Sequence, residues 1–167
     1  MKNVLKITTV IAIALLFSCG GGEDKKKEGF TLKKKAETET KSTENDASVL
    51  PSARIDLTNK GIGPVKSLVL PEEIDQTMVA NGQEIYNKMC TACHRPDKKF
   101  IGPAQFGVLE RRTPEWIMNM ILNPVEMVQK DPLAKALLIE FNGSPMANQN
   151  LTQDEARAVL EYFRTLK

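Results

Sequence analysis

The sequence contains little histidine, cysteine or tryptophan. Its 167 residues include one histidine, three cysteines and one tryptophan, and aromatic residues make up 5%. A structural zinc site needs four ligands, and the chain supplies four only if Cys19, near the N-terminus, takes part. Basic and acidic residues nearly balance at 23 and 21, and the lysine runs are not interleaved with aromatic residues. This pattern excludes nucleic-acid binding.

The scarce reactive side chains are concentrated in one short motif. The only histidine and two of the three cysteines stand together in Cys90-Thr91-Ala92-Cys93-His94. The pattern C-x-x-C-H is typical of covalent attachment of haem c, in which each thiol forms a thioether and the imidazole binds the iron. A zinc site or a redox-active dithiol is the alternative. A thioredoxin-like dithiol would need alternating strands and helices around the motif, and none is visible.

The N-terminus resembles a bacterial lipoprotein signal. Two lysines precede an apolar stretch at residues 10–17 that is too short to span a bilayer comfortably. The stretch leads into Leu16-Phe17-Ser18-Cys19-Gly20, which resembles the bacterial lipobox. The resemblance implies that residues 1–18 are a signal peptide and that Cys19 carries lipid. An ordinary secretory signal or an uncleaved membrane anchor is the alternative. We expect a periplasm-facing protein of the cell envelope, anchored to the membrane by lipid.

Three segments follow the signal. Residues 19–48 contain lysine and acidic runs with almost no large apolar residue, which predicts a disordered tether because so little surface can be buried. Residues 49–70 contain glycine and proline breakers and are expected to form an extended N-terminal arm. Residues 71–167 are long enough for one small domain.

This domain is predicted to be all-α, with about four to five short helices. The first helix is expected to start at Pro71 and to lead to the haem motif, with Gly82 permitting close packing. Further helix starts are indicated by proline and capping signals at Thr113-Pro114, Asp131-Pro132 and Thr152 to Glu155. Asn123-Pro124 is expected to end the helix that starts at Pro114.

The domain resembles a class I cytochrome c over roughly residues 75–167. The matching motifs occur in the family's order: Gly82 and Tyr86, the haem motif, Gly102-Pro103, Trp116, Asn123-Pro124, Met146 and Tyr162. The resemblance implies the cytochrome c fold, in which the first and last helices cross beside one haem. It also implies that the Pro103 carbonyl accepts a hydrogen bond from the axial imidazole. Trp116 is expected to pack against the haem edge or near a propionate.

The second axial ligand distinguishes an electron carrier from a haem that binds small molecules. The resemblance implies Met146, which lies in a loop with Gly143 and Pro145 before the last helix. A thioether raises the reduction potential relative to imidazole or water and keeps the iron six-coordinate. Met127 is the competing methionine, because it follows Asn123-Pro124 in a short connecting stretch. Any methionine can also be core filler.

Two groups of basic residues lie near the expected haem. Arg111 and Arg112 are candidates for pairing with a haem propionate, and a solvated pair is the alternative. Lys88, Arg95, Lys98 and Lys99 are candidates for a local basic rim near the haem motif, and a scattered solvated surface is the default interpretation.

We therefore expect a membrane-anchored, periplasmic electron carrier with one haem c, no catalytic residue and no small-molecule substrate. The expected donor is a quinol-oxidising complex or another cytochrome, and the expected acceptor is a terminal oxidase or a periplasmic reductase. A looser resemblance to lipoprotein cytochromes encoded near nitrous oxide reductases implies that reductase as one acceptor. The alternative function is a haem enzyme or gas-binding sensor with an open sixth coordination site. The absence of a distal histidine argues against it.

Overall fold

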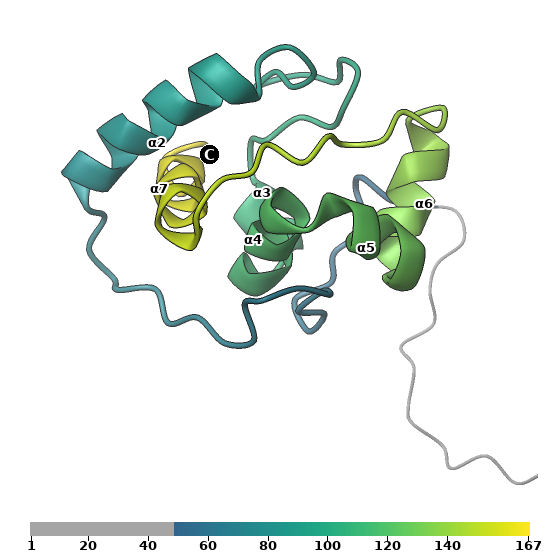
Figure 1. The fold of residues 1–167 in the computed structure, drawn as a ribbon, viewed down its shortest axis with the longest axis horizontal. Helices are drawn as coiled ribbons and strands as arrows, with labels where there is room; N and C mark the ends of the chain where they lie inside the picture. Colours follow the sequence, from purple (N-terminus) through teal and green to yellow (C-terminus); the bar gives the residue numbers. More distant parts are fainter. Residues whose placement is uncertain (1–48) are drawn as a thin grey trace, which may run out of the picture. The chain divides into compact units, whose positions relative to one another are not determined.

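The structure, a computed structural model, describes residues 49–167. This part of the chain contains six α-helices and no β-strand (Figure 1). The helices are α2 (Gln76–Met89), α3 (Val108–Arg111), α4 (Pro114–Leu122), α5 (Pro124–Lys130), α6 (Pro132–Glu140) and α7 (Gln153–Phe163). None of them is long and apolar enough to cross a membrane. The predicted signal peptide, the lipidated Cys19 and the tether lie outside the described residues.

The all-α prediction is confirmed, but the expected four to five helices are too few. The two helices without a sequence signal of their own are α3 and α5, which have four and seven residues. Segments this short do not show a helical period. α5 begins at Pro124, directly after α4, where the sequence favours a connecting stretch. Proline suits this place because the first turn of a helix does not use its N–H.

The first helix begins later than the sequence predicts. α2 starts at Gln76 rather than at Pro71, and the Asp75 carboxylate caps it by accepting two backbone N–H groups of the first turn, at 2.8 and 3.0 Å. The preceding residues are held by the last helical segment, because Arg164 donates to the carbonyls of Pro71 and Glu72. This long-range contact overrides the local start signal.

α2 and α7 form the central contact of the domain. In Figure 1, α7 is seen nearly end-on while α2 lies across the view, so the two helices cross steeply. Gly82 lies directly against the backbone of Ala158, where a Cβ would overlap the carbonyl oxygen. One turn along, the Tyr86 and Tyr162 rings tilt against each other with centroids 5.5 Å apart. The two helices thus meet at Gly82 and Tyr162, and the close packing predicted at Gly82 is confirmed.

The predicted caps of the later helices are also confirmed. Thr113 caps α4 by accepting the Trp116 N–H at 3.1 Å, and Asp131 caps α6 by accepting the Ala134 N–H at 2.7 Å. Thr152 begins a complete capping box at the start of α7. The sequence predicts these caps because each cap residue lies within three residues of the backbone N–H that it binds.

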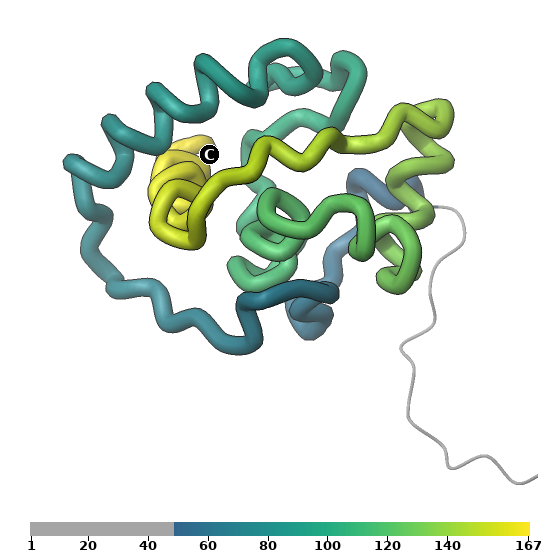
Figure 2. Tube along the Cα trace, viewed as in Figure 1, coloured from purple at the N-terminus to yellow at the C-terminus, as the bar shows by residue number. Residues whose placement is uncertain are grey.

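Residues 49–70 form an arm without helix that packs on α4, α5 and α6 (Figure 2). Buried Asn119 on α4 accepts the Val65 N–H at 2.9 Å and donates to the carbonyls of Lys60 and Val65 at 2.9 and 2.8 Å. Near the beginning of the arm, the Ser52 N–H and hydroxyl donate to the Glu140 carboxylate at 2.7 and 2.5 Å. The side chains of the helical domain thus supply hydrogen bonds to the arm backbone.

Candidate haem-binding site

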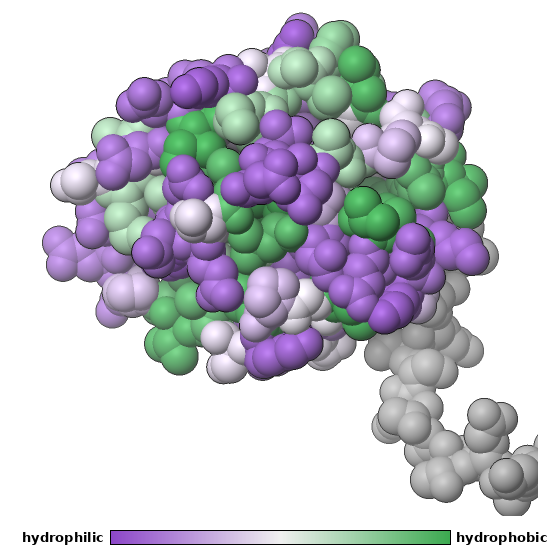
Figure 3. Space-filling view, in the orientation of Figure 1, coloured by the Kyte–Doolittle hydropathy of each residue, from purple (hydrophilic) through white to green (hydrophobic). Residues whose placement is uncertain are grey.

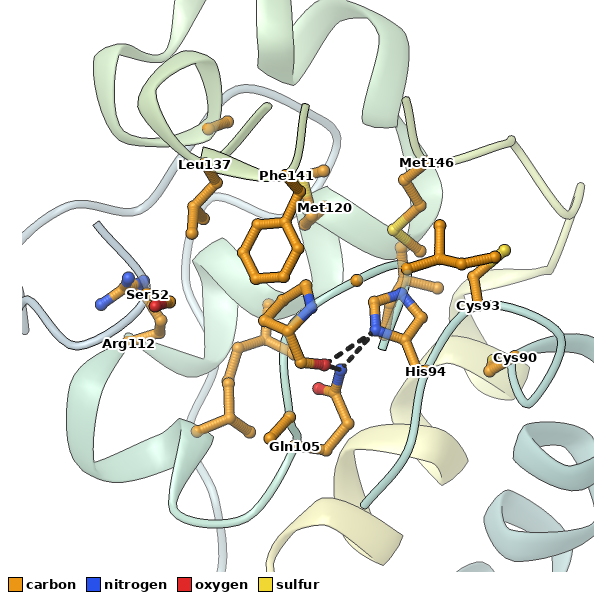
Figure 4. Close-up of a pocket in the computed structure, with 18 of the residues that line it drawn as sticks. Ser52, Cys90, Cys93, His94, Gln105, Arg112, Met120, Leu137, Phe141 and Met146 are labelled. Carbon is orange, nitrogen blue, oxygen red and sulfur yellow. Dashed lines mark hydrogen bonds between the residues drawn. The ribbon is translucent and has the colours of Figure 1, made fainter. Parts of the chain in front are cut away.

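A cavity of about 210 Å³ lies between the loop that follows α2, the helices α4 and α6, and the loop that precedes α7. Its apolar wall includes Ile101, Val108, Ile117, Ile121, Leu137 and Phe141. His94 and Met146 both line this cavity, and their side chains lie near each other (Figure 4). The site is therefore an apolar slot with a few polar groups at its rim.

The two motif cysteines follow directly on the end of α2. Cys90 caps the helix by donating its N–H to the Tyr86 carbonyl. The N–H groups of Cys93 and His94 then both donate to the Cys90 carbonyl, at 3.1 and 2.9 Å. This single turn brings both sulfurs and the imidazole to the same cavity, as the spacing predicts. Burial raises the pKa of the Cys90 thiol to about 11, while Cys93 is exposed.

The zinc alternative finds no support in the structure. Residues 49–167 contain no cluster of three or more histidine, cysteine, aspartate or glutamate side chains that could hold a metal ion. A structural zinc site requires such a cluster.

The imidazole of His94 is held by the loop that follows the motif. Its Nδ1 lies 3.0 Å from the Pro103 carbonyl oxygen. Burial lowers the pKa of His94 more than the Pro103 hydrogen bond raises it, so the free ring is neutral at pH 7. When Nε2 of a neutral ring binds iron, Nδ1 keeps its proton and donates to a carbonyl. Gly102 allows the close approach, because a Cβ there would overlap the ring. Pro103 thus lies where its predicted role requires it.

The imidazole has one further neighbour that is not predicted from the sequence. Gln105 is only 8% exposed, and its Nε2 lies 2.9 Å from His94 Nδ1 and 3.0 Å from the Pro103 oxygen (Figure 4). Its backbone N–H donates to the Pro96 carbonyl at 3.0 Å, which fixes its place in the loop. The only sequence signal for Gln105 is that it is a polar residue in a largely apolar loop, two positions after a proline.

The competing methionines lie in different places. Met146 lines the cavity and points toward His94 in Figure 4. Met127 is fully buried in α5, and its sulfur accepts the Ile62 backbone N–H at 3.0 Å. It lies outside the cavity lining. Met89 on α2 and Met120 on α4 also line the cavity. Of the two weighed candidates, only Met146 shares the cavity with His94.

The family model for cytochrome c matches residues 79–167, which is more than half of the chain. The chain belongs to the cytochrome c family. A solved cytochrome c from Rhodothermus marinus is 43% identical with a TM-score of 0.61, and the match covers 70% of this chain and 93% of that one. An engineered cytochrome c from the same organism is 42% identical with a TM-score of 0.61, covering 70% and 94%.

A further solved structure shows an engineered Rhodothermus marinus cytochrome c bound to a carbene intermediate. It is 43% identical with a TM-score of 0.58, and the match covers 70% of this chain and 94% of that one. No curated protein sequence matches the chain at a significant level.

A cytochrome c binds one haem c covalently and carries electrons between protein redox partners. The residues present fit this group. Cys90 and Cys93 lie at the cavity beside the imidazole of His94, and Gly102 leaves room for that ring. When bound, the haem supplies an iron that takes up and releases one electron. The chain contributes the thiols that attach it, the apolar wall that excludes water and the carbonyl that orients the imidazole.

Two other predicted neighbours of the haem line the cavity of this cytochrome. Trp116 is buried in its wall, with its indole N–H donating to the Asp131 carboxylate at 3.2 Å. Arg112 is 3% exposed and donates to three backbone carbonyls, those of Pro51, Arg54 and Arg111. Burial lowers its pKa to about 10, so it remains charged at neutral pH. Its pairing with a propionate stays a prediction.

Proposed function

We propose that this cytochrome is a lipid-anchored, periplasm-facing carrier of single electrons, with His94 and Met146 as the axial ligands of its iron. It is not an enzyme in this proposal and takes no small-molecule substrate. The observation that supports it most directly is the presence of both side chains in the lining of one cavity. Between two protein ligands the iron stays six-coordinate, so little needs to move when the electron arrives.

The arm contributes to the choice between the two methionines. The Ile62 N–H donates a hydrogen bond to the Met127 sulfur. Met127 belongs to the buried core and does not line the cavity. Met146 lies in the segment between α6 and α7, which has no helix, and its side chain lines the cavity. A thioether ligand gives a higher potential than an imidazole or water would give.

Trp116 and Arg112 complete the proposed haem site. Trp116 forms part of the apolar wall, and Arg112 provides positive charge for a haem propionate. Because the Arg112 guanidinium also binds the arm carbonyls of Pro51 and Arg54, the arm helps to hold it at the cavity.

The proposed redox partners are proteins of a respiratory chain. A quinol-oxidising complex or another cytochrome donates the electron, and a terminal oxidase or a periplasmic reductase, such as a nitrous oxide reductase, accepts it. Exposed apolar side chains near the motif, Phe100, Ile101 and Phe106, provide a surface for short-lived contact. Figure 3 shows that apolar patches lie between polar ones on the face in view. Transient redox contacts are typically small.

The axial ligation is tested by the absorption spectrum of the haem-loaded protein. We expect ferric wild-type protein to show the weak far-red band of thioether-bound haem, and Met146→Leu to lose it. Met120→Leu tests another methionine that lines the cavity, and Met78→Leu, away from the cavity, is the matched control. Both should keep the band. A reduced wild-type protein that binds carbon monoxide readily would support the alternative, a haem enzyme or gas sensor with an open sixth site.

The anchor is tested separately in a bacterial host that processes lipoproteins. The wild-type chain is expected in the membrane fraction, and Cys19→Ser in the soluble periplasmic or uncleaved form. Equal distribution of mature wild-type and variant protein would overturn the lipid anchor and leave the haem site untouched.

A further inference from the structure

Gln105, His94 and Pro103 form a compact polar group in a largely apolar cavity wall. The three atoms involved are the Gln105 Nε2, the His94 Nδ1 and the Pro103 carbonyl oxygen, and they lie 2.9 to 3.0 Å from one another. Figure 4 shows both contacts of the glutamine as dashed lines. Two nitrogens thus share a single carbonyl acceptor.

The protonation of this group follows from the iron ligand. When His94 binds iron through Nε2, its Nδ1 carries a proton and is a donor. The amide of Gln105 then cannot donate to Nδ1 and donates to the Pro103 oxygen instead. Turning the amide over would bring its own oxygen to about 3 Å from the Pro103 oxygen, and two acceptors would repel each other. The amide nitrogen therefore faces the ring.

This arrangement weakens electron donation by the imidazole. A carbonyl that accepts strongly from Nδ1–H makes the imidazole more basic and stabilises ferric iron. Because the Pro103 oxygen also accepts a hydrogen bond from Gln105, its hydrogen bond with the His94 Nδ1–H is weaker. In addition, the positive end of the amide dipole lies beside the ring, in a place that water barely reaches. Both effects favour the ferrous form.

We propose that Gln105 is a positioning residue that raises the reduction potential of this cytochrome by sharing the Pro103 carbonyl with the axial imidazole. The consequence for electron transfer rests on the proposed carrier function. Within the fold Gln105 is well placed for this role, because its backbone N–H is bonded to Pro96 and its side chain has little freedom to turn away.

The test is an equilibrium redox titration of full-length, haem-loaded protein. Gln105→Leu removes the competing donor and the dipole. We expect its ferric-to-ferrous ratio at a fixed ambient potential to rise about threefold or more. Gln105→Glu replaces the donor with an acceptor for Nδ1–H, and we expect a rise of about tenfold, which is about 59 mV for a one-electron couple. Gln83→Leu, the same substitution on the exposed face of α2, should leave the ratio unchanged.

A second readout separates tuning from simple loss of structure. The NMR signal of the His94 Nδ1 proton in the reduced protein should move downfield in Gln105→Leu, because its hydrogen bond to Pro103 strengthens. The far-red band should persist in both Gln105 variants. A potential that is unchanged or higher in both variants, with the band retained, would overturn the role of Gln105 alone. Absence of the band from the wild-type protein would instead overturn the proposed ligation. Should Gln105→Leu fail to take up haem, Gln105→Glu decides the proposal.

Discussion

Gly82 of α2 lies against the carbonyl oxygen of Ala158 in α7, so closely that no side chain fits between the two backbones. This contact sets the distance between the two helices that cross beside the haem motif. Because backbone of both helices forms the contact, neither can move away by changing a rotamer.

The first prediction concerns this crossing. Gly82→Ala should lower the free energy of unfolding by about 2 kcal/mol, because the gain in helix propensity is smaller than the cost of separating the helices. Denaturant unfolding monitored by circular dichroism measures the change. Asn81→Ala, an exposed neighbour on the same helix, is the control and should be neutral or stabilising. Equal stability of the two variants would contradict the close contact.

The second prediction concerns Gly102. A Cβ at this position would overlap the His94 ring, so Gly102→Ala should push the imidazole away from Pro103 and from the iron. We expect little covalent haem, or haem whose ferric spectrum lacks the six-coordinate low-spin form. The measurement is the absorption spectrum per mole of purified protein. A variant with wild-type haem content and spectrum would show that the loop has room for a methyl group.

The third prediction concerns the arm. Asn119→Ala removes one acceptor and two donors that pair with the arm backbone at Lys60 and Val65. We expect a loss of about 3 kcal/mol in the free energy of unfolding, together with faster proteolysis within residues 49–70. Asn87→Ala on the exposed face of α2 serves as the control. If the two variants are cut at the same rate, the arm does not depend on Asn119.

The fourth prediction concerns acid stability. Burial alone would raise the pKa of Glu161. Its hydrogen bonds with Arg157 and the Asp75 N–H and the charge of Arg164 lower the pKa by more than burial raises it, so the net pKa is below 4.5. A carboxylate with a lowered folded pKa stabilises the fold above its unfolded pKa, and this contribution is lost as pH falls through the folded value.

Glu161→Gln should therefore be less stable than wild type at neutral pH. The gap, meaning the difference in unfolding temperature between the two proteins, should narrow from pH 4.5 downward. Thermal unfolding over a pH series measures the gap. Glu155 also has a lowered pKa but is exposed, so Glu155→Gln should show a smaller gap. A gap for Glu161→Gln that stays constant with pH would show that its loss is structural rather than electrostatic.

Local signals made much of this protein predictable. The haem motif, the turn that follows it and the cap residues Thr113 and Asp131 each act within a few residues, so their patterns are visible in the sequence. Pro103 was predicted because the family places a carbonyl there, and the structure puts it within hydrogen-bond distance of His94.

The errors came from contacts between distant parts of the chain. Pro71 is a good local start for a helix, but Arg164 donates a hydrogen bond to its carbonyl, and the helix begins only after the N-cap residue Asp75. Met127 is only the alternative ligand in the sequence, but it could not be set aside there, because nothing in its own segment shows that the Ile62 N–H donates to its sulfur. Gln105 is not predicted for the same reason. Its contacts are with the His94 Nδ1 and the Pro103 carbonyl oxygen, and only the fold brings these two atoms to it.

The contacts of Arg164 and Gly82 have a consequence for biosynthesis. The start of α2 is bonded to side chains of the last helical segment, more than eighty residues later. α2 therefore cannot dock on α7 while only the earlier part of the domain has been synthesised, because the side chains that bind its start lie so much later in the chain. Until α7 has been synthesised the domain stays open beside the haem motif, so the thiols of Cys90 and Cys93 remain accessible for haem attachment during that time.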